Sequence, residues 1–216
     1  MIINNFSNAL ITRLQLDLPG HDSHLKMSSK LRIKWIKSFA DAISFKKSAV
    51  LILIYSKNNE LYTILIQRPV YNGVHSNQIC FPGGKFEIDD TDLYHTAKRE
   101  CFEEVGVEIH DTNLLGELSE LFIPPSRFRV LPVIASIRHQ PIFKPNELEV
   151  QQIIEVKLAD LFNEVNSKKV YMKVRGIRFK TPAIVIDHHV IWGATAMIIQ
   201  EFKDVCSEIP INYLSK

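Results

Sequence analysis

The sequence is poor in the features that mark several large classes of protein. Cysteine occurs only three times, as Cys80, Cys101 and Cys206. Their odd number and the lack of a short metal-ligand spacing argue against a disulfide framework and against a zinc site. No apolar run approaches the length of a membrane span. Polar residues such as Asn4 and Arg13 interrupt the N-terminal segment, where a signal peptide would lie. We therefore predict a cytoplasmic protein that does not associate with a membrane.

An excess of charge of one sign is also missing. The formal net charge is +2, with 23% charged and 46% hydrophobic residues, which is ordinary for a soluble globular protein. Basic residues cluster only in Lys168-Lys169 and between Lys173 and Lys180, and we interpret this cluster as the solvated face of a hairpin. A nucleic-acid-binding protein usually carries a concentrated basic patch, so we predict no nucleic-acid partner.

The length of 216 residues suits one domain, or one domain with an appendage, and is enough to bury a sizeable core. Residues 1–48 contain a short apolar group, a break at Pro19-Gly20, and apolar residues at mixed helical spacing from Leu31 to Phe45. We predict an N-terminal helical extension over residues 1–48, packed on a domain that comprises residues 49–216.

Strand-like segments follow and are interleaved with a few helices. A β-branched run from Ala49 to Tyr55, a polar turn and a second run from Leu61 to Gln67 predict a hairpin. A helix is expected to begin near Thr91-Asp92 and to end at Gly106. The other predicted strands are Ile79–Phe81, Leu114–Phe122, Val130–Ile137, Ile153–Val156, Tyr171–Phe179 and Ala183–Val190, and the other predicted helices are Ala159–Phe162 and Ala194–Val205. This order predicts an α+β fold with a mixed sheet.

A group of carboxylates follows a glycine turn. The turn is Phe81-Pro82-Gly83-Gly84-Lys85, and the helix that follows it contains Glu100, Glu103 and Glu104. Residues three and four apart share one face of a helix, so these three carboxylates gather into one patch. Their mutual repulsion favours a bound Mg²⁺ or Mn²⁺ ion, since both prefer oxygen ligands and bridge carboxylates to phosphates. The pattern thus indicates phosphate chemistry.

The same residues resemble the sequence signature of the Nudix family. From Arg99 to Val107 the chain matches the second half of the Nudix box completely. Gly84 precedes Arg99 by one residue more than the box prescribes, and Asp89-Asp90 stands near the place of its first glutamate. This departure is similar to the coenzyme A pyrophosphatase branch of the family. Further similarities to that branch are Gln67-Arg68, His75, the segment from Gln78 to Lys85, and the segment from Ile191 to Ala196.

The resemblance implies a fold and a set of roles. The expected fold is an α/β/α sandwich. The metal ligands would be Glu100, Glu103, Glu104 and the carbonyl group of Gly84, and Arg99 would orient one of the carboxylates. Candidates for substrate binding are Arg68, Lys85, His75 and Gln78, with Arg68 or Lys85 pairing with the diphosphate or with the 3′-phosphate of coenzyme A. His75 and Gln78 could equally have a purely structural role.

A general base is expected outside the metal ligands, because metal-bound carboxylates are poor bases. The segment Asn146-Glu147-Leu148-Glu149-Val150 precedes a predicted strand and supplies two candidates. Glu149 fits the branch better because a valine follows it, and Glu147 is the alternative. Both could also be ordinary surface carboxylates.

These observations predict a Mg²⁺- or Mn²⁺-dependent pyrophosphatase that binds a small nucleotide substrate. The resemblance implies coenzyme A or acyl-coenzyme A, cleaved to 4′-phosphopantetheine and adenosine 3′,5′-bisphosphate. ADP-ribose, NADH and other dinucleotides share the diphosphate and are the main alternative. A non-catalytic nucleotide-binding Nudix module is a second alternative, although the box keeps every metal-ligating glutamate. An RNA-cap pyrophosphatase would need a basic channel that this chain does not show. A homodimer is left open.

Overall fold

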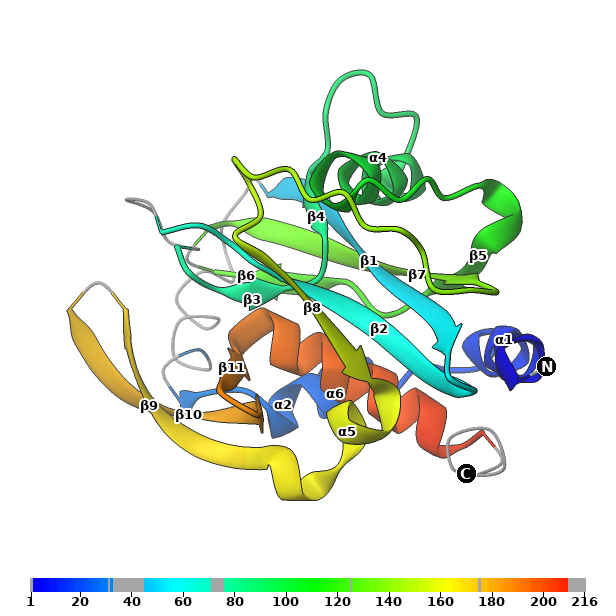
Figure 1. Ribbon diagram of the computed structural model, residues 1–216. Coiled ribbons are helices and arrows are strands. Elements are labelled where there is room, and N and C mark those ends of the chain that lie inside the picture. The colour runs from blue at the N-terminus through cyan, green and yellow to red at the C-terminus, as the bar shows by residue number, and fades with distance from the viewer. Residues whose placement is uncertain are drawn as a thin grey trace.

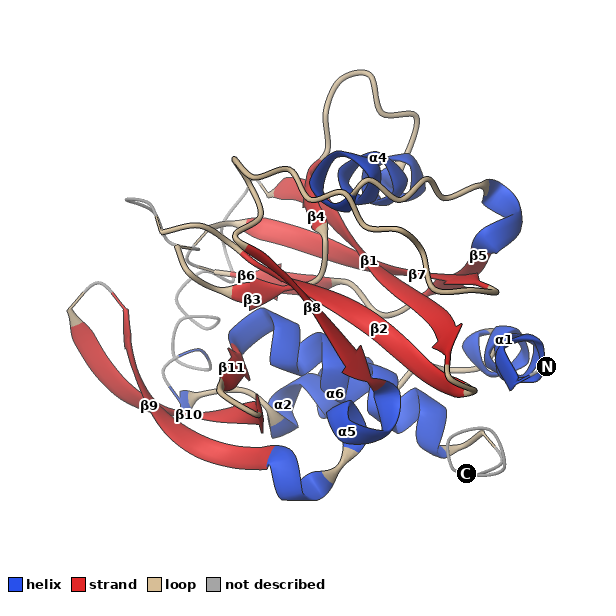
Figure 2. Ribbon diagram, viewed as in Figure 1, coloured by secondary structure: helices blue, strands red, loops and turns tan. Residues whose placement is uncertain are grey.

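A computed structural model describes residues 2–30, 32, 45–70, 76–124, 126–174 and 176–209. Over these residues the chain forms a mixed sheet between two helical layers, with a smaller antiparallel sheet at one end (Figure 1; Figure 2). This arrangement confirms the predicted α+β sandwich. Most of the segment from Leu31 to Phe45, expected to continue the N-terminal helical extension, lies outside the described residues.

The larger sheet has two long central strands. β1 (Lys46–Lys57) pairs in parallel with β7 (Phe128–Ile137) and antiparallel with β2 (Glu60–Gln67). The remaining strands extend or cap this centre, and every one of them pairs antiparallel. They are β3 (Ile79–Cys80), β4 (Gly83–Lys85), β5 (Leu114–Glu117), β6 (Leu121–Ile123) and β8 (Gln152–Lys157).

Both faces of this sheet are covered, and β1 shows why. Leu51, Leu53 and Tyr55 pack into the core beneath α4 (Leu93–Val105). Ile52 and Ile54 point to the opposite core, which contains α6 (Gly193–Ser207). Successive side chains of a strand face opposite sides, so an unbroken apolar run supplies two cores at once. α4 and α6 therefore form the outer layers of the sandwich (Figure 1).

The N-terminal region contributes α1 (Ile2–Leu14) and α2 (Gly20–Lys26). Phe6 and Leu10 of α1 are fully buried in the α6-side core. The buried carboxylate of Glu201 in α6 binds α2 at two points. It accepts a hydrogen bond from the Gly20 backbone N–H at 3.2 Å and lies 2.7 Å from Nε2 of His24. The N-terminal helices thus pack directly on the layer that contains α6.

The strands differ most from the sequence predictions in two places. The predicted strand Leu114–Phe122 is two strands, β5 and β6, which pair with different stretches of β7. Between them the chain turns away from the ladder, and the Ser119 N–H donates to Glu201 at 3.1 Å. The sequence predicts a single strand because leucines occur on both sides of this break and Leu118 lies within it.

The second difference concerns the smaller sheet, which contains β9 (Ser167–Val174), β10 (Ile177–Ile186) and β11 (His189–Trp192). The predicted turn between residues 179 and 183 instead lies inside β10, and the chain reverses at Gly176, whose φ is +82°. A left-handed φ is easily adopted by glycine, so Gly176 marks the turn. The short segments α5 (Leu158–Phe162), η1 (Asp111–Asn113) and η2 (Glu164–Asn166) complete the described elements.

Candidate active site

The helix α4 begins and ends where the sequence indicates. The Asp92 side chain accepts a hydrogen bond from the His95 backbone N–H, which caps the N-terminus. Gly106 ends the helix with φ +71°, and a Cβ atom there would lie 2.7 Å from Cβ of Lys144. The glycine therefore serves both the left-handed C-terminal turn and the close approach of the loop that carries Glu149.

Arg99 ties this helix to the preceding loop. Its Nε and Nη2 atoms donate to the two carboxylate oxygens of Asp90 at 2.9 and 3.0 Å, and Nη2 also donates to the Lys85 carbonyl at 3.1 Å. Its Nη1 atom donates to Glu100 at 3.1 Å and to Glu103 at 2.9 Å. These bonds hold the pKa of the buried Asp90 carboxyl well below its usual range. A bidentate arginine–carboxylate pair fixes position as well as charge.

Asp90 explains the departure from the box. The sequence placed the Asp89-Asp90 pair near the missing glutamate without choosing between them. Asp90 is 5% exposed and also accepts a hydrogen bond from Oγ1 of Thr96. Asp89 is exposed. The extra residue before α4 is therefore accommodated in the loop, while Asp90 lies against Arg99.

Glu104 is fully buried beside the glycine turn. One of its carboxylate oxygens accepts the Gly83 backbone N–H at 2.7 Å, and the other accepts Nη2 of Arg68 at 3.2 Å. Nη2 of Arg68 also donates to the Gly83 carbonyl at 2.9 Å. Burial raises the pKa of Glu104 to about 8, although the charge of Arg68 opposes this shift. Arg68, predicted to contact substrate, thus holds the turn and Glu104 together.

Glu100 lies directly against Gly84. β4 brings Gly84 opposite Ala49 of β1, and a Cβ atom at position 84 would be 2.2 to 2.6 Å from the carboxylate atoms of Glu100. Burial raises the pKa of Glu100, partly offset by Arg99. The glycine turn therefore gives the Glu100 carboxylate room to lie at the Gly84 backbone.

We expect Gly84→Ala to disable the site. The added methyl group would clash with the Glu100 carboxylate, and so should reduce turnover at least about a hundredfold by displacing a reacting-site group by roughly an ångström. Turnover measured with saturating Mg²⁺ checks this. Gly176→Ala is the control: a Cβ atom there meets nothing within 4 Å, so its cost comes from the left-handed φ of +82°, about 1–2 kcal/mol of folding stability, with no loss of activity. A fully active Gly84→Ala variant would contradict the placement of Glu100.

The candidate base lies in a loop held against the end of α4. Backbone N–H groups of Lys144 and Asn146 donate to the carbonyls of Val105 and Glu104 at 2.8 and 3.0 Å. The negative charge of Glu149 in this loop raises the pKa of both Glu100 and Glu104. Glu149 is the loop carboxylate among the main causes of both shifts, which favours it over Glu147 as the candidate base.

The donor set suits a hard divalent cation. Glu100 and Glu104 are carboxylates that have lost water on burial, and such groups need a positive partner. Glu103 is half exposed on the same helix face. As they stand, no three Asp, Glu, His or Cys side chains within the described ranges converge on one point as a complete ligand set, and Arg68 and Arg99 neutralise them instead. The chemistry of the donors therefore fits the cation, while the side-chain positions are those set by the arginines.

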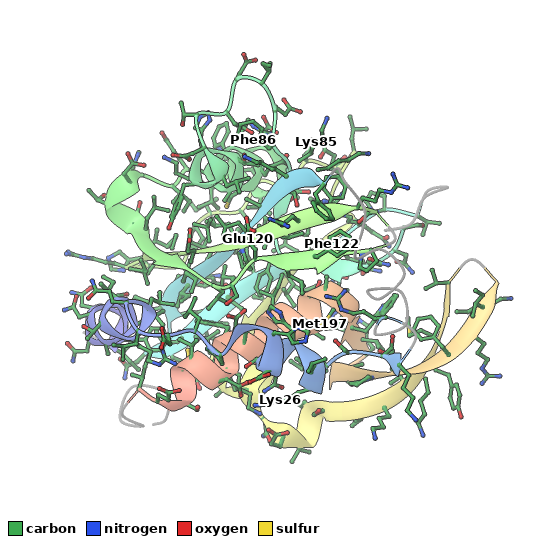
Figure 3. All side chains as sticks on the ribbon, turned by 180° about the vertical axis from the view of Figure 1, so that it is seen from behind. Lys26, Lys85, Phe86, Glu120, Phe122 and Met197 are labelled. Carbon is green, nitrogen blue, oxygen red and sulfur yellow. The ribbon has the colours of Figure 1, made fainter. Side chains whose placement is uncertain are left out.

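A pocket of about 420 Å³ opens beside these carboxylates. Its lining includes Arg68, Gln78 and the turn from Gly83 to Lys85, together with apolar side chains of the small sheet and α6. Figure 3 shows, from behind, Lys85 high in the molecule and Met197 on α6 below it; both line the pocket, which thus joins the two layers. Lys85 is exposed. His75, the remaining predicted substrate contact, lies outside the described residues.

Comparison with known proteins identifies the family to which this chain belongs. Residues 45–174 match the NUDIX domain model, so the chain belongs to the Nudix family. It is a hydrolase that acts on nucleoside-diphosphate-linked compounds, and enzymes of this family generally use divalent metal ions. In the described part of the chain, no helix has the length and apolar character needed to span a membrane.

Two proteins similar in sequence and one solved structure with the same fold illustrate the family relationship. The chain is 32% identical to the mitochondrial coenzyme A diphosphatase NUDT8 of Mus musculus over 65% of this chain and 67% of that protein. It is 28% identical to the uncharacterized Nudix hydrolase NudL of Yersinia pestis over 96% of this chain and 98% of that protein. A MutT/nudix family protein from Enterococcus faecalis shares the fold, with a TM-score of 0.54 and 14% identity over 94% of this chain and 82% of that one.

Proposed function

We propose that this protein hydrolyses the diphosphate of coenzyme A or an acyl-coenzyme A, giving 4′-phosphopantetheine and adenosine 3′,5′-bisphosphate. The observation that carries the proposal is that Arg68 and Gly84, which lie against Glu104 and Glu100, also line a mostly apolar pocket. A nucleoside triphosphate would need only the carboxylate cluster. A substrate with an organic arm on each side of its diphosphate would use both the cluster and the pocket. The likeness to the mouse coenzyme A diphosphatase supports the same substrate.

We assign the metal ligands to Glu100, Glu103, Glu104 and the carbonyl of Gly84. The chemistry that Mg²⁺ or Mn²⁺ supplies when bound there is neutralisation of charge on the diphosphate and activation of water. Arg99 keeps Glu100 and Glu103 in place through the bonds of its Nη1 atom.

The remaining residues bind substrate and move the proton. Glu149 takes a proton from the attacking water while the water oxygen forms a bond to phosphorus. The bridging P–O bond breaks, and the leaving phosphate departs with its electron pair. The exposed Lys85 ammonium, next to the glycine turn, pairs with a phosphate oxygen. Arg68 acts through Glu104 as a positioning residue, and Gln78 contacts the substrate from the pocket wall.

A rate comparison tests the substrate. Coenzyme A, dephospho-coenzyme A, ADP-ribose, NADH and the nucleoside triphosphates should be assayed side by side with Mg²⁺ and with Mn²⁺, and kcat/KM should be highest for coenzyme A or its acyl form. Chelation of the metal should abolish turnover. Cleavage of ADP-ribose at least tenfold faster than coenzyme A would contradict the proposal. Tight binding of a nucleotide without any hydrolysis would favour a non-catalytic module.

A further inference from the structure

Among the described residues, the pocket beside the carboxylates is lined by cations and by no anions. Among its described lining residues are the basic side chains Arg32, Arg68 and Lys85, whereas Asp and Glu are absent from that lining. Most of the remaining lining is apolar, including Phe128, Phe179 and Trp192. Charge in an apolar, concave site acts strongly on a ligand because little water screens it. The pocket therefore favours a ligand with anionic groups.

Two of the three cations already have a place in the proposed reaction. Arg68 bonds to Glu104 and to the Gly83 carbonyl, so its guanidinium holds the turn. Lys85 is exposed beside Gly84, where the diphosphate would lie. The third cation, Arg32, comes from the N-terminal region and has no part in the carboxylate cluster.

Arg32 is built into the pocket wall, where no described residue supplies a compensating charge. Its backbone N–H donates to Oγ of Ser29 at 3.1 Å, and both residues line the pocket. Its Nε atom is buried and has no hydrogen-bond partner among the described residues. Burial lowers the pKa of the Arg32 guanidinium to about 10. Because a buried unpaired donor is costly, an anionic ligand group at this position would satisfy a need that the described protein atoms leave open.

The substrate supplies one anion besides its diphosphate. In coenzyme A the pantetheine arm is uncharged, whereas the adenosine arm carries a 3′-phosphate. Adenine also stacks well on aromatic side chains, of which the pocket offers several. The cationic and aromatic lining thus fits the adenosine arm better than the pantetheine arm.

We propose that Arg32 binds the 3′-phosphate of the substrate's adenosine half, which occupies the pocket between the glycine turn and Trp192. This inference rests on the proposed function for the identity of the substrate. It makes Arg32 a specificity-determining residue contributed by the N-terminal region. Arginine is suited to this role because its planar fork binds phosphate oxygens in a bidentate manner.

Calorimetric binding of adenosine 3′,5′-bisphosphate and of adenosine 5′-monophosphate tests the proposal without requiring turnover. The wild-type protein should bind the bisphosphate more tightly. Arg32→Gln should weaken bisphosphate binding by about tenfold to a hundredfold, and leave monophosphate and 4′-phosphopantetheine binding unchanged. Arg32→Lys should retain part of the preference. Lys30→Gln is the matched control, because it removes an exposed charge from the same segment outside the pocket lining.

A kinetic arm separates this inference from the proposed function. In Arg32→Gln, the kcat/KM ratio of coenzyme A to dephospho-coenzyme A should fall by the same factor, with the rate for dephospho-coenzyme A unchanged. Equal binding of the two nucleotides by the wild type, or equal losses for both in Arg32→Gln, would overturn the role of Arg32 even if coenzyme A is the best substrate. Failure of the wild type to cleave coenzyme A would instead contradict the proposed function.

Discussion

Glu104→Gln should lower kcat by about three orders of magnitude, because it removes the charge of a proposed metal ligand, and metal-ion charge stabilisation is worth several kcal/mol to the transition state. Its folding stability should fall by about 1–3 kcal/mol. The two carboxylate oxygens accept from the Gly83 N–H and from Arg68, so the NH2 group of a glutamine would face one of these donors. Turnover of coenzyme A and the thermal unfolding midpoint, measured on the same preparation, check both statements.

Two further variants make this result specific. Glu103 lies on the same face of the helix, and its side chain is half exposed. Glu103→Gln should therefore also lose turnover, and no change in the burial of a charge contributes to that loss. Glu108 lies just beyond the helix, with its side chain 73% exposed and Nδ1 of His110 at 4.0 Å from its carboxylate. Glu108→Gln should therefore behave as wild type. Wild-type rates in Glu103→Gln and Glu104→Gln would show that the metal assignment is wrong.

Local sequence patterns predict the layers of the fold and most of its helices. The apolar run in β1 and the Asp92 and Gly106 signals of α4 each depend on residues close in the sequence. The split between β5 and β6 depends on Glu201, a side chain more than eighty residues away that accepts the Ser119 N–H. The sequence around the break does not contain that partner, so a single strand was the natural prediction.

The candidate site also combines features that local sequence predicts with features that depend on distant contacts. Helical spacing alone placed Glu100, Glu103 and Glu104 on one face. The role of Asp90 was only approximated, because an added loop residue changes which carboxylate meets Arg99. The pairing of Arg68 with Glu104 was missed since it joins β2 to α4. Arg32 had no signal at all: it belongs to no motif, and its place in the pocket is set by how the N-terminal region packs.

The choice between the two candidate bases can be made by matched substitutions. Glu149→Gln should reduce kcat by about a hundredfold to ten-thousandfold, the usual contribution of general acid–base catalysis. Glu147→Gln should stay close to wild type. The two residues share one exposed loop, but Glu149 is the one whose charge is among the main causes of the raised pKa values of Glu100 and Glu104. A base must reach the attacking water, which the proposed mechanism places at those carboxylates, so this electrostatic coupling favours Glu149.

Metal binding must be measured alongside, because a lost ligand would also lower kcat. If Glu149 acts as the base, the affinity for Mn²⁺ followed by paramagnetic resonance and the KM for coenzyme A should both be unchanged in Glu149→Gln. A parallel loss of Mn²⁺ affinity would make Glu149 a metal ligand instead. A larger loss of kcat in Glu147→Gln would transfer the base role to Glu147. Rates within about threefold of wild type in both variants, far below the range expected for a base, would exclude this loop as the source of the base.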